Sequence, residues 1–80
     1  MPTLARLGNG RILIRVFARD HVPPHFHITT PDGDAQVSVP GLVLLNGRIR
    51  RGDLELALRW AVPNQNLINE LWDQLNGRIH

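Results

Sequence analysis

The sequence contains no cysteine, no lysine and no tyrosine. The absence of cysteine excludes disulfides, thiolate metal sites and cysteine nucleophiles. It also fits a reducing compartment such as the cytoplasm. No apolar run approaches the ~20 residues that span a bilayer, and the N-terminus lacks the apolar region of a signal peptide. We therefore expect a cytoplasmic protein that has no contact with a membrane.

Net charge is also low, at +2, and all basic residues are arginines. The exclusive use of arginine reflects either the base composition of the genome or a preference for bidentate contacts to carboxylate or phosphate. A chain of 80 residues is expected to form one domain over residues 1–80,. Such a domain is too small for a deep enclosed site, so a site would be a shallow cleft, a sheet face or a dimer seam.

Three segments alternate between apolar and polar residues, which is typical of half-buried β-strands. They cover residues 11–19, 25–30 and 34–39. Residues 42–50 contain Asn46-Gly47, a pair that favours tight β-turns, and they predict a short β-hairpin,.

The apolar period becomes helical after Gly52,. Pro63 is expected to stop or kink the first helix, Asn64 to cap the second, and Asn76-Gly77 to end it. Strands followed by helices predict an α+β fold: a mainly antiparallel sheet of three to five N-terminal strands with two C-terminal helices packed on one face. The predicted core comprises Ile12, Ile14, Val16, Phe26, Ile28, Val37, Val39, Leu54, Leu58, Ala61, Leu67, Leu71 and Trp72.

The residues that carry chemistry concentrate in one segment, Asp20-His21-Val22-Pro23-Pro24-His25-Phe26-His27. On a strand, His25 and His27 point to the same side, and the rigid diproline could bring His21 back towards them. Three imidazoles, with Asp20 as a fourth ligand or as a hydrogen-bond acceptor behind them, would suit a divalent transition metal such as zinc.

Other interpretations of the three histidines remain open. They could serve the fold alone, by stacking on Trp60 or by hydrogen-bonding the backbone. They could also contact a partner or nucleic acid. In a third interpretation they catalyse metal-free RNA cleavage. His27 would then pair with either His21 or His25, and the two would act as general base and general acid. The lack of tyrosine excludes the nucleases that add a tyrosine to a histidine–hydrophobe–histidine triplet.

A basic cluster follows the predicted hairpin turn, with Arg48 and Arg50 on one strand face and Arg51 beside them. These arginines could bind nucleic acid or an acidic partner. Alternatively, they are the solvated charges of an edge strand. Nucleic acid is not the favoured partner, because the outer face of the second predicted helix is neutral to acidic.

The segment from Asp20 to His27 resembles the hallmark of a family of small bacterial proteins, domain-of-unknown-function family 4160. The similarity extends to Leu-Ala-Leu-Arg-Trp at 56–60 and Glu-Leu-Trp at 70–72, whereas Pro63 departs from the more continuous helical pattern of the family. No established reaction comes with this resemblance. Members are often encoded beside another small protein, in an arrangement similar to toxin–antitoxin pairs.

The resemblance therefore implies a small interaction module of a two-gene, toxin–antitoxin-like system that acts by protein–protein contact. Its expected partner is a small protein encoded by a neighbouring gene, and a homodimer is a further expectation. The alternative function is a compact metal-dependent or histidine-based nuclease or hydrolase centred on His21, His25 and His27.

Overall fold

The computed structural model describes residues 3–77, and residues 1, 2 and 78–80 lie outside the described part. Within it, five strands form one antiparallel sheet in which each strand pairs with the next strand in the chain. The strands are β1 (Thr3–Leu7), β2 (Ile12–Arg15), β3 (His25–Thr30), β4 (Gly33–Ser38) and β5 (Leu44–Arg48). The predicted α+β class and antiparallel sheet are confirmed.

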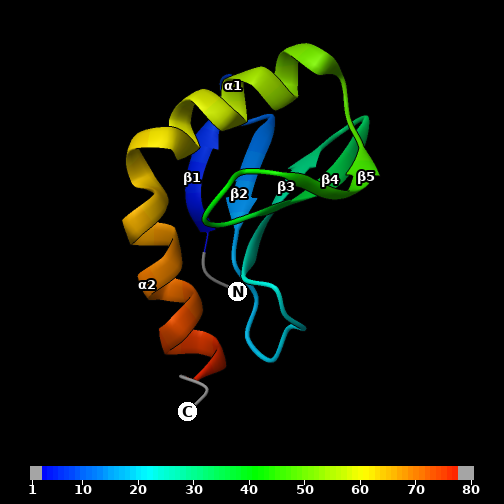
Figure 1. Ribbon diagram of the computed structural model, residues 1–80. Coiled ribbons are helices and arrows are strands. Elements are labelled where there is room, and N and C mark those ends of the chain that lie inside the picture. The colour runs from blue at the N-terminus through cyan, green and yellow to red at the C-terminus, as the bar shows by residue number, and fades with distance from the viewer. Residues whose placement is uncertain (1–2, 78–80) are drawn as a thin grey trace.

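The helical part of the chain is one continuous segment, residues 51–76, that bends near its middle (Figure 1). It consists of α1 (Arg51–Ala61), a 3₁₀ turn (Val62–Asn64) and α2 (Gln65–Asn76). Pro63 has no N–H for an α-helical hydrogen bond, which explains the tighter turn at this point. The prediction of two helices is therefore correct only in part, because it splits a single segment.

The ends of α2 differ in how well the sequence predicts them. Asn64 makes no capping hydrogen bond to α2. Its Nδ2 instead donates to the carbonyl of Trp60 at 2.7 Å, so the side chain caps the C-terminal end of α1. Gly77 follows α2 with a φ of +74°, as the predicted helix end requires,. Neither helix is long and apolar enough to cross a membrane.

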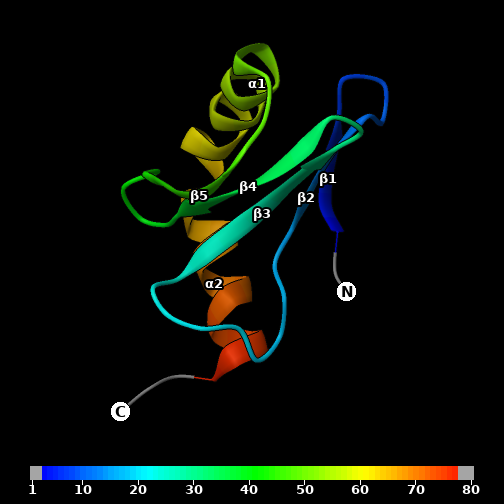
Figure 2. The same cartoon turned by 90° about the vertical axis from the view of Figure 1, so that its right-hand side faces the viewer.

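The core lies between one face of the sheet and the helical segment (Figure 2). Alternate residues of β2, β3 and β4 point towards the buried residues of the helices, which are Ala57, Ala61, Ile68 and Trp72. The buried apolar residues are Ile12, Ile14, Val16, Phe26, Ile28, Ala35, Val37, Val39, Ala57, Ala61, Ile68 and Trp72.

The strand part of the predicted core is confirmed, and the errors fall on the helices. Leu54, Leu58 and Leu71 are only partly buried at the edge of the core. Leu67 is wrong, because its side chain is 49% exposed, whereas Ile68 beside it is completely buried. Successive helical residues point about 100° apart around the axis, so neighbours such as Leu67 and Ile68 cannot both face the sheet. The apolar stripe of the helix is wider than the face that packs on the sheet.

The segment β5 is one strand paired with β4, so the predicted hairpin over residues 42–50 is wrong. Asn46 and Gly47 lie inside the strand and form no turn between two strands. Gly47 has a φ of +95°, and a Cβ atom there would overlap the carbonyl oxygen of Asp34. The glycine is needed for the close approach of β4 and β5.

The loop between β2 and β3, residues 16–24, lies beyond the end of the sheet and beside the C-terminal end of α2 (Figures 1 and 2). Helix α2 extends past the strands to reach it. A hydrogen bond from the backbone N–H of Asp20 to Oδ1 of Asn76 joins the two. The histidine segment is therefore held between a strand, a loop and a helix end.

Candidate metal centre

The β2–β3 loop turns back onto β3 through several backbone constraints. Arg19 has a φ of 57°, a left-handed conformation that few non-glycine residues adopt,. The peptide bond before Pro23 is cis. The carbonyl of Pro24 accepts a backbone hydrogen bond at 2.9 Å that extends the β3–β4 ladder. The loop thus delivers Asp20 to the beginning of β3, next to His25.

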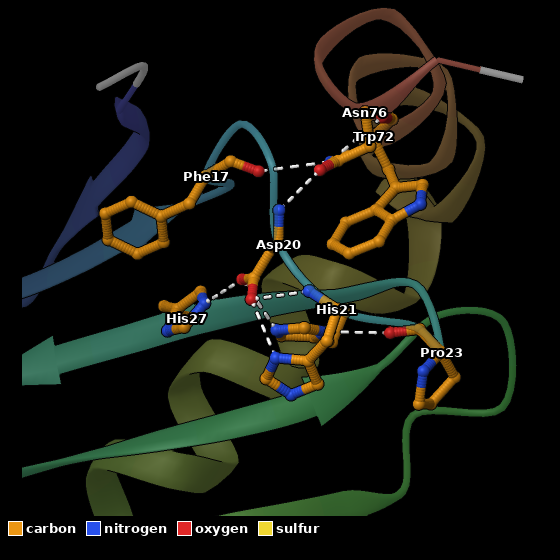
Figure 3. Close-up of polar contacts among 8 residues, drawn as sticks. Phe17, Asp20, His21, Pro23, His27, Trp72 and Asn76 are labelled. Carbon is orange, nitrogen blue, oxygen red and sulfur yellow. Dashed lines mark hydrogen bonds and ion pairs between the residues drawn. The ribbon is translucent and has the colours of Figure 1, made fainter.

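Asp20 lies at the centre of the cluster, and both of its carboxylate oxygens make contacts (Figure 3). Its Oδ2 accepts a hydrogen bond from Nε2 of His27 at 2.9 Å, and Nε2 of His25 lies at the same distance from it. Its Oδ1 accepts from the backbone N–H of His21 at 2.9 Å and lies 3.0 Å from the ring Nδ1 of that residue. One carboxylate therefore contacts three histidines.

The environment of Asp20 favours the ionised carboxylate. Partial burial by itself raises the pKa of Asp20, but the hydrogen bonds from His27 and His21 and the charges of His25 and His27 outweigh it and lower the pKa below its ordinary value,. Because the folded-state pKa is lowered, the stabilisation is present above the unfolded-state pKa and is lost as the pH falls through the folded-state pKa. A ligating carboxyl must likewise be ionised.

His25 is the most constrained of the imidazoles. Its side chain is completely buried, and its ring lies 5.0 Å from the ring of Trp72 in α2. Nδ1 of His25 lies 2.7 Å from the carbonyl oxygen of Pro23. Since a carbonyl oxygen can only accept, Nδ1 carries a proton. In the neutral form of the ring, the lone pair therefore lies on Nε2, which is buried and has no hydrogen-bond partner among residues 3–77.

Nε2 of His25 lies close to Asp20 but does not point at it. The 2.9 Å separation from Oδ2 would suit a hydrogen bond, yet the direction does not, and none forms. Two ligands of one metal ion have this relation, because each lone pair points at the ion between them. Ligand atoms about 2.0–2.1 Å from a tetrahedral zinc ion lie roughly 3.3 Å apart, slightly farther than here.

His27 completes a group that could hold a metal ion. Its ring centroid lies 5.0 Å from that of His25, so the predicted proximity of the two imidazoles is confirmed. Phe17 packs edge-on against the His27 ring at 4.3 Å and restricts its orientation. The ligand atoms of Asp20, His25 and His27 all lie within 4.8 Å of one another.

His21 lies next to this group and not in it. Its side chain is 72% exposed and contacts the other oxygen of Asp20. Its ring centroid is 5.1 Å from that of His25, so the diproline loop does bring it near. The structure therefore places Asp20 against both the buried His25 and the partly buried His27, with His21 on the solvent side.

The end of α2 supports the cluster from behind. Asn76 accepts from the backbone N–H of Asp20 at 2.7 Å through Oδ1. Its Nδ2 donates to the carbonyls of Phe17 at 3.1 Å and of Trp72 at 3.2 Å (Figure 3). One amide thus fixes both sides of the loop that carries Asp20, while Trp72 packs on His25.

Residues 11–73 match the model of a protein family described as "Domain of unknown function (DUF4160)". The chain belongs to this family. No curated protein and no solved structure matches the chain. The DUF4160 match includes every residue from Asp20 to His27, so the polar cluster lies inside the family domain. The description names no reaction, and the function must be argued from the geometry.

The predicted basic cluster is dispersed in this DUF4160 domain. Arg48 ends β5, Arg50 precedes α1 and Arg51 begins it, so the prediction that Arg48 and Arg50 share a strand face is wrong. Nε of Arg50 lies 3.3 Å from Oδ2 of Asp32, and Arg48 lies opposite Asp34 in β4. All three arginines are exposed.

Sequence reasoning missed the supporting residues of the centre. The aromatic neighbour of His25 is Trp72 and not Trp60, and the two rings are tilted by 50° and not stacked. The sequence predicts Asn76 only as part of a helix end, and Phe17 only as one residue of the strand expected over residues 11–19. A polar residue in the last turn of an amphipathic helix gives a weak signal of a tertiary contact. Only the docking of α2 against the loop reveals these roles.

Proposed function

We propose that this protein binds one divalent transition-metal ion of the zinc type through Asp20, His25 and His27. The observation that carries the proposal is the buried Nε2 of His25. This atom has no hydrogen-bond partner within residues 3–77 and lies beside an ionised carboxylate. A buried lone pair next to an anion is unfavourable. A cation between Nε2 of His25 and the Asp20 carboxylate would accept the lone pair and compensate the negative charge.

The ligand set suits such an ion. Two imidazoles and one carboxylate are ligands that zinc and several related metals accept. Nδ1 of His25 donates to the carbonyl of Pro23, the outer hydrogen bond that ligating histidines generally make,. His27 would release its Nε2 proton when the ion binds, because that proton now occupies the ligand position,.

Three protein ligands leave one tetrahedral position for water or substrate, the pattern of catalytic rather than structural zinc sites. A divalent ion lowers the pKa of a bound water, which is the basis of metal-dependent hydrolysis. Exposed His21, whose ring contacts Oδ1 of Asp20, would exchange protons between this position and solvent,. These features support a compact metal-dependent hydrolase.

The proposal is tested by metal analysis of purified protein. After incubation with zinc, nickel or manganese and dialysis, the wild type is expected to retain one ion per chain of its preferred metal. His25→Ala and His27→Ala are expected to retain none, whereas His21→Ala, which removes an exposed ring, retains the ion. A wild type without metal, or equal retention by His25→Ala, would refute the metal centre.

A second candidate function is the interaction module implied by the family resemblance, and one observation favours it. Val43, Leu44 and Leu45 are 59%, 49% and 42% exposed, and β5 is an edge strand of the sheet. Apolar side chains on an open strand edge are a typical surface for adding a strand of another protein. We propose as occupant the small protein encoded by a neighbouring gene in a toxin–antitoxin-like pair.

Co-expression tests this second function. The neighbouring gene product is expected to co-purify with the wild type and not with Leu44→Ser/Leu45→Ser, and growth of cells expressing either protein alone would show toxicity. The matched control is Leu67→Ser, an equally exposed leucine on α2. Loss of co-purification in both variants, or in neither, would contradict binding at β5, as would a homodimer at this edge.

A further inference from the structure

Arg15 is the last residue of β2 and lies directly opposite His27 in β3. Residues paired across antiparallel strands point to the same side of the sheet, with Cβ atoms about 4.5–5.5 Å apart. The neighbouring pair in the two strands, Ile14 and Ile28, points to the opposite side and belongs to the core. Arg15 and His27 therefore share the face that the helices leave uncovered, and the side chain of Arg15 begins next to a ligand of the proposed metal centre.

This arginine has no partner in the described part of the chain. Its Nε is buried and makes no hydrogen bond. No carboxylate of residues 3–77 forms an ion pair with it, in contrast to Arg11 and Arg50, which contact acidic residues. A half-buried guanidinium without an anion is unusual because arginine is generally paired when it is removed from water.

The positive charges of the proposed metal ion and of Arg15 together favour an anionic ligand. A divalent ion at Asp20, His25 and His27 would share this face of the sheet with a second positive charge, and like charges repel. A negatively charged ligand between the ion and the guanidinium converts this repulsion into two attractions. The unpaired arginine thus indicates the sign of the ligand charge.

We propose that Arg15 binds a phosphate group that also occupies the open position of the metal ion. This inference rests on the metal centre proposed above and names its substrate class as phosphate esters. A phosphate has enough oxygens to place one on the ion and two on the guanidinium fork, whereas a carboxylate has only two in all. Gln36, opposite His27 on the other side of β3, adds an uncharged hydrogen-bonding group on the same face.

The inference is tested with the protein loaded with cobalt(II), whose visible absorption spectrum reports the ligands of the ion. Inorganic phosphate is titrated into the loaded wild type, Arg15→Gln and Arg15→Lys. The wild-type spectrum is expected to change to a plateau. Arg15→Gln is expected to need at least about tenfold more phosphate, since a charge-assisted hydrogen bond is lost. Arg15→Lys, which keeps the charge but not the fork, falls between the two.

Two controls separate the outcomes. Arg59→Gln removes an exposed arginine of α1 and is expected to bind phosphate as the wild type does. Cobalt affinity is measured first in every variant, and Arg15→Gln is expected to bind cobalt at least as tightly as the wild type, because a like charge is removed; this also shows that the variant is folded. If no cobalt binds to the wild type, the metal centre and this inference both fail.

If cobalt binds but Arg15→Gln responds to phosphate as the wild type does, only the role of Arg15 is refuted. An equal response to acetate and phosphate would overturn the assignment of the ligand class. Binding of a phosphate monoester such as phenyl phosphate, compared with a dinucleotide, then distinguishes small esters from nucleic acid as the source of the group.

Discussion

The side-chain amide of Asn76 accepts a hydrogen bond from the backbone N–H of Asp20 at 2.7 Å, across 56 residues of sequence. Its Nδ2 holds the carbonyl of Phe17 on the other side of the same loop. The last turn of α2 is therefore the part of the molecule that positions the carboxylate, and the geometry of the cluster depends on the docking of the helix.

Replacement of Asn76 by alanine should loosen this loop. We expect Asn76→Ala to lose about 1–3 kcal/mol in free energy of unfolding, because partly buried backbone groups lose their partners. We also expect weaker metal binding, since Asp20 is no longer held in place. Urea unfolding and a metal titration measure the two effects, with Asn66→Ala, an exposed position of the same helix, as control. Equal behaviour of the two variants would contradict the positioning role.

His25→Phe separates a metal ligand from a structural histidine. Phenylalanine keeps the aromatic contact with Trp72 but removes both ring nitrogens. The lost bond to Pro23 is offset by removal of the unpartnered Nε2, so the metal-free protein should change in stability by less than about 1.5 kcal/mol. Metal binding should disappear. A large loss of stability without metal, measured by urea unfolding, would favour a purely structural role.

Metal should stabilise the fold, because the ligands come from the loop and β3 and the loop is held by α2. A free metal concentration about 100 times the dissociation constant corresponds to about 2.7 kcal/mol of added stability. We expect a higher unfolding temperature with metal, reversed by a chelator and absent in His27→Ala. An identical increase in His27→Ala would show that the metal binds elsewhere.

Gly47→Ala tests the assignment of β5 as a continuous strand. The added Cβ would meet the carbonyl oxygen of Asp34 and Cα of Ala35, at a backbone φ of +95°. We expect a loss of about 3 kcal/mol or more in the free energy of unfolding, in the range of backbone strain combined with steric overlap. Gly52→Ala is the control, since no atom lies within 4 Å of its Cβ position. Tolerance of Gly47→Ala would instead support a flexible turn.

Burial and the side of the sheet on which a residue lies could be predicted from the sequence wherever a local pattern determines them. Alternation in β2 and β3 identified the buried Ile14 and Phe26, and it also placed the rings of His25 and His27 on one side. Strand geometry has a period of two residues, so it determines such relations without tertiary information. The class of fold followed from the order of these patterns.

Features that depend on tertiary contacts could not be predicted. Asn46-Gly47 has the composition of a tight turn, but the approach of β4 makes it part of a strand. The unpaired Nε2 of His25 depends on the carbonyl of Pro23, and the position of Asp20 depends on Asn76. These contacts join segments whose relative placement is set by packing.

The most direct test of the metal centre is a crystal structure of the protein grown with zinc, with diffraction data collected on both sides of the zinc absorption edge. We predict one anomalous peak bonded to Oδ2 of Asp20 and to Nε2 of His25 and His27, with His21 outside the first ligand sphere. A peak elsewhere, or no peak while Nε2 of His25 still lacks a partner, would contradict the account.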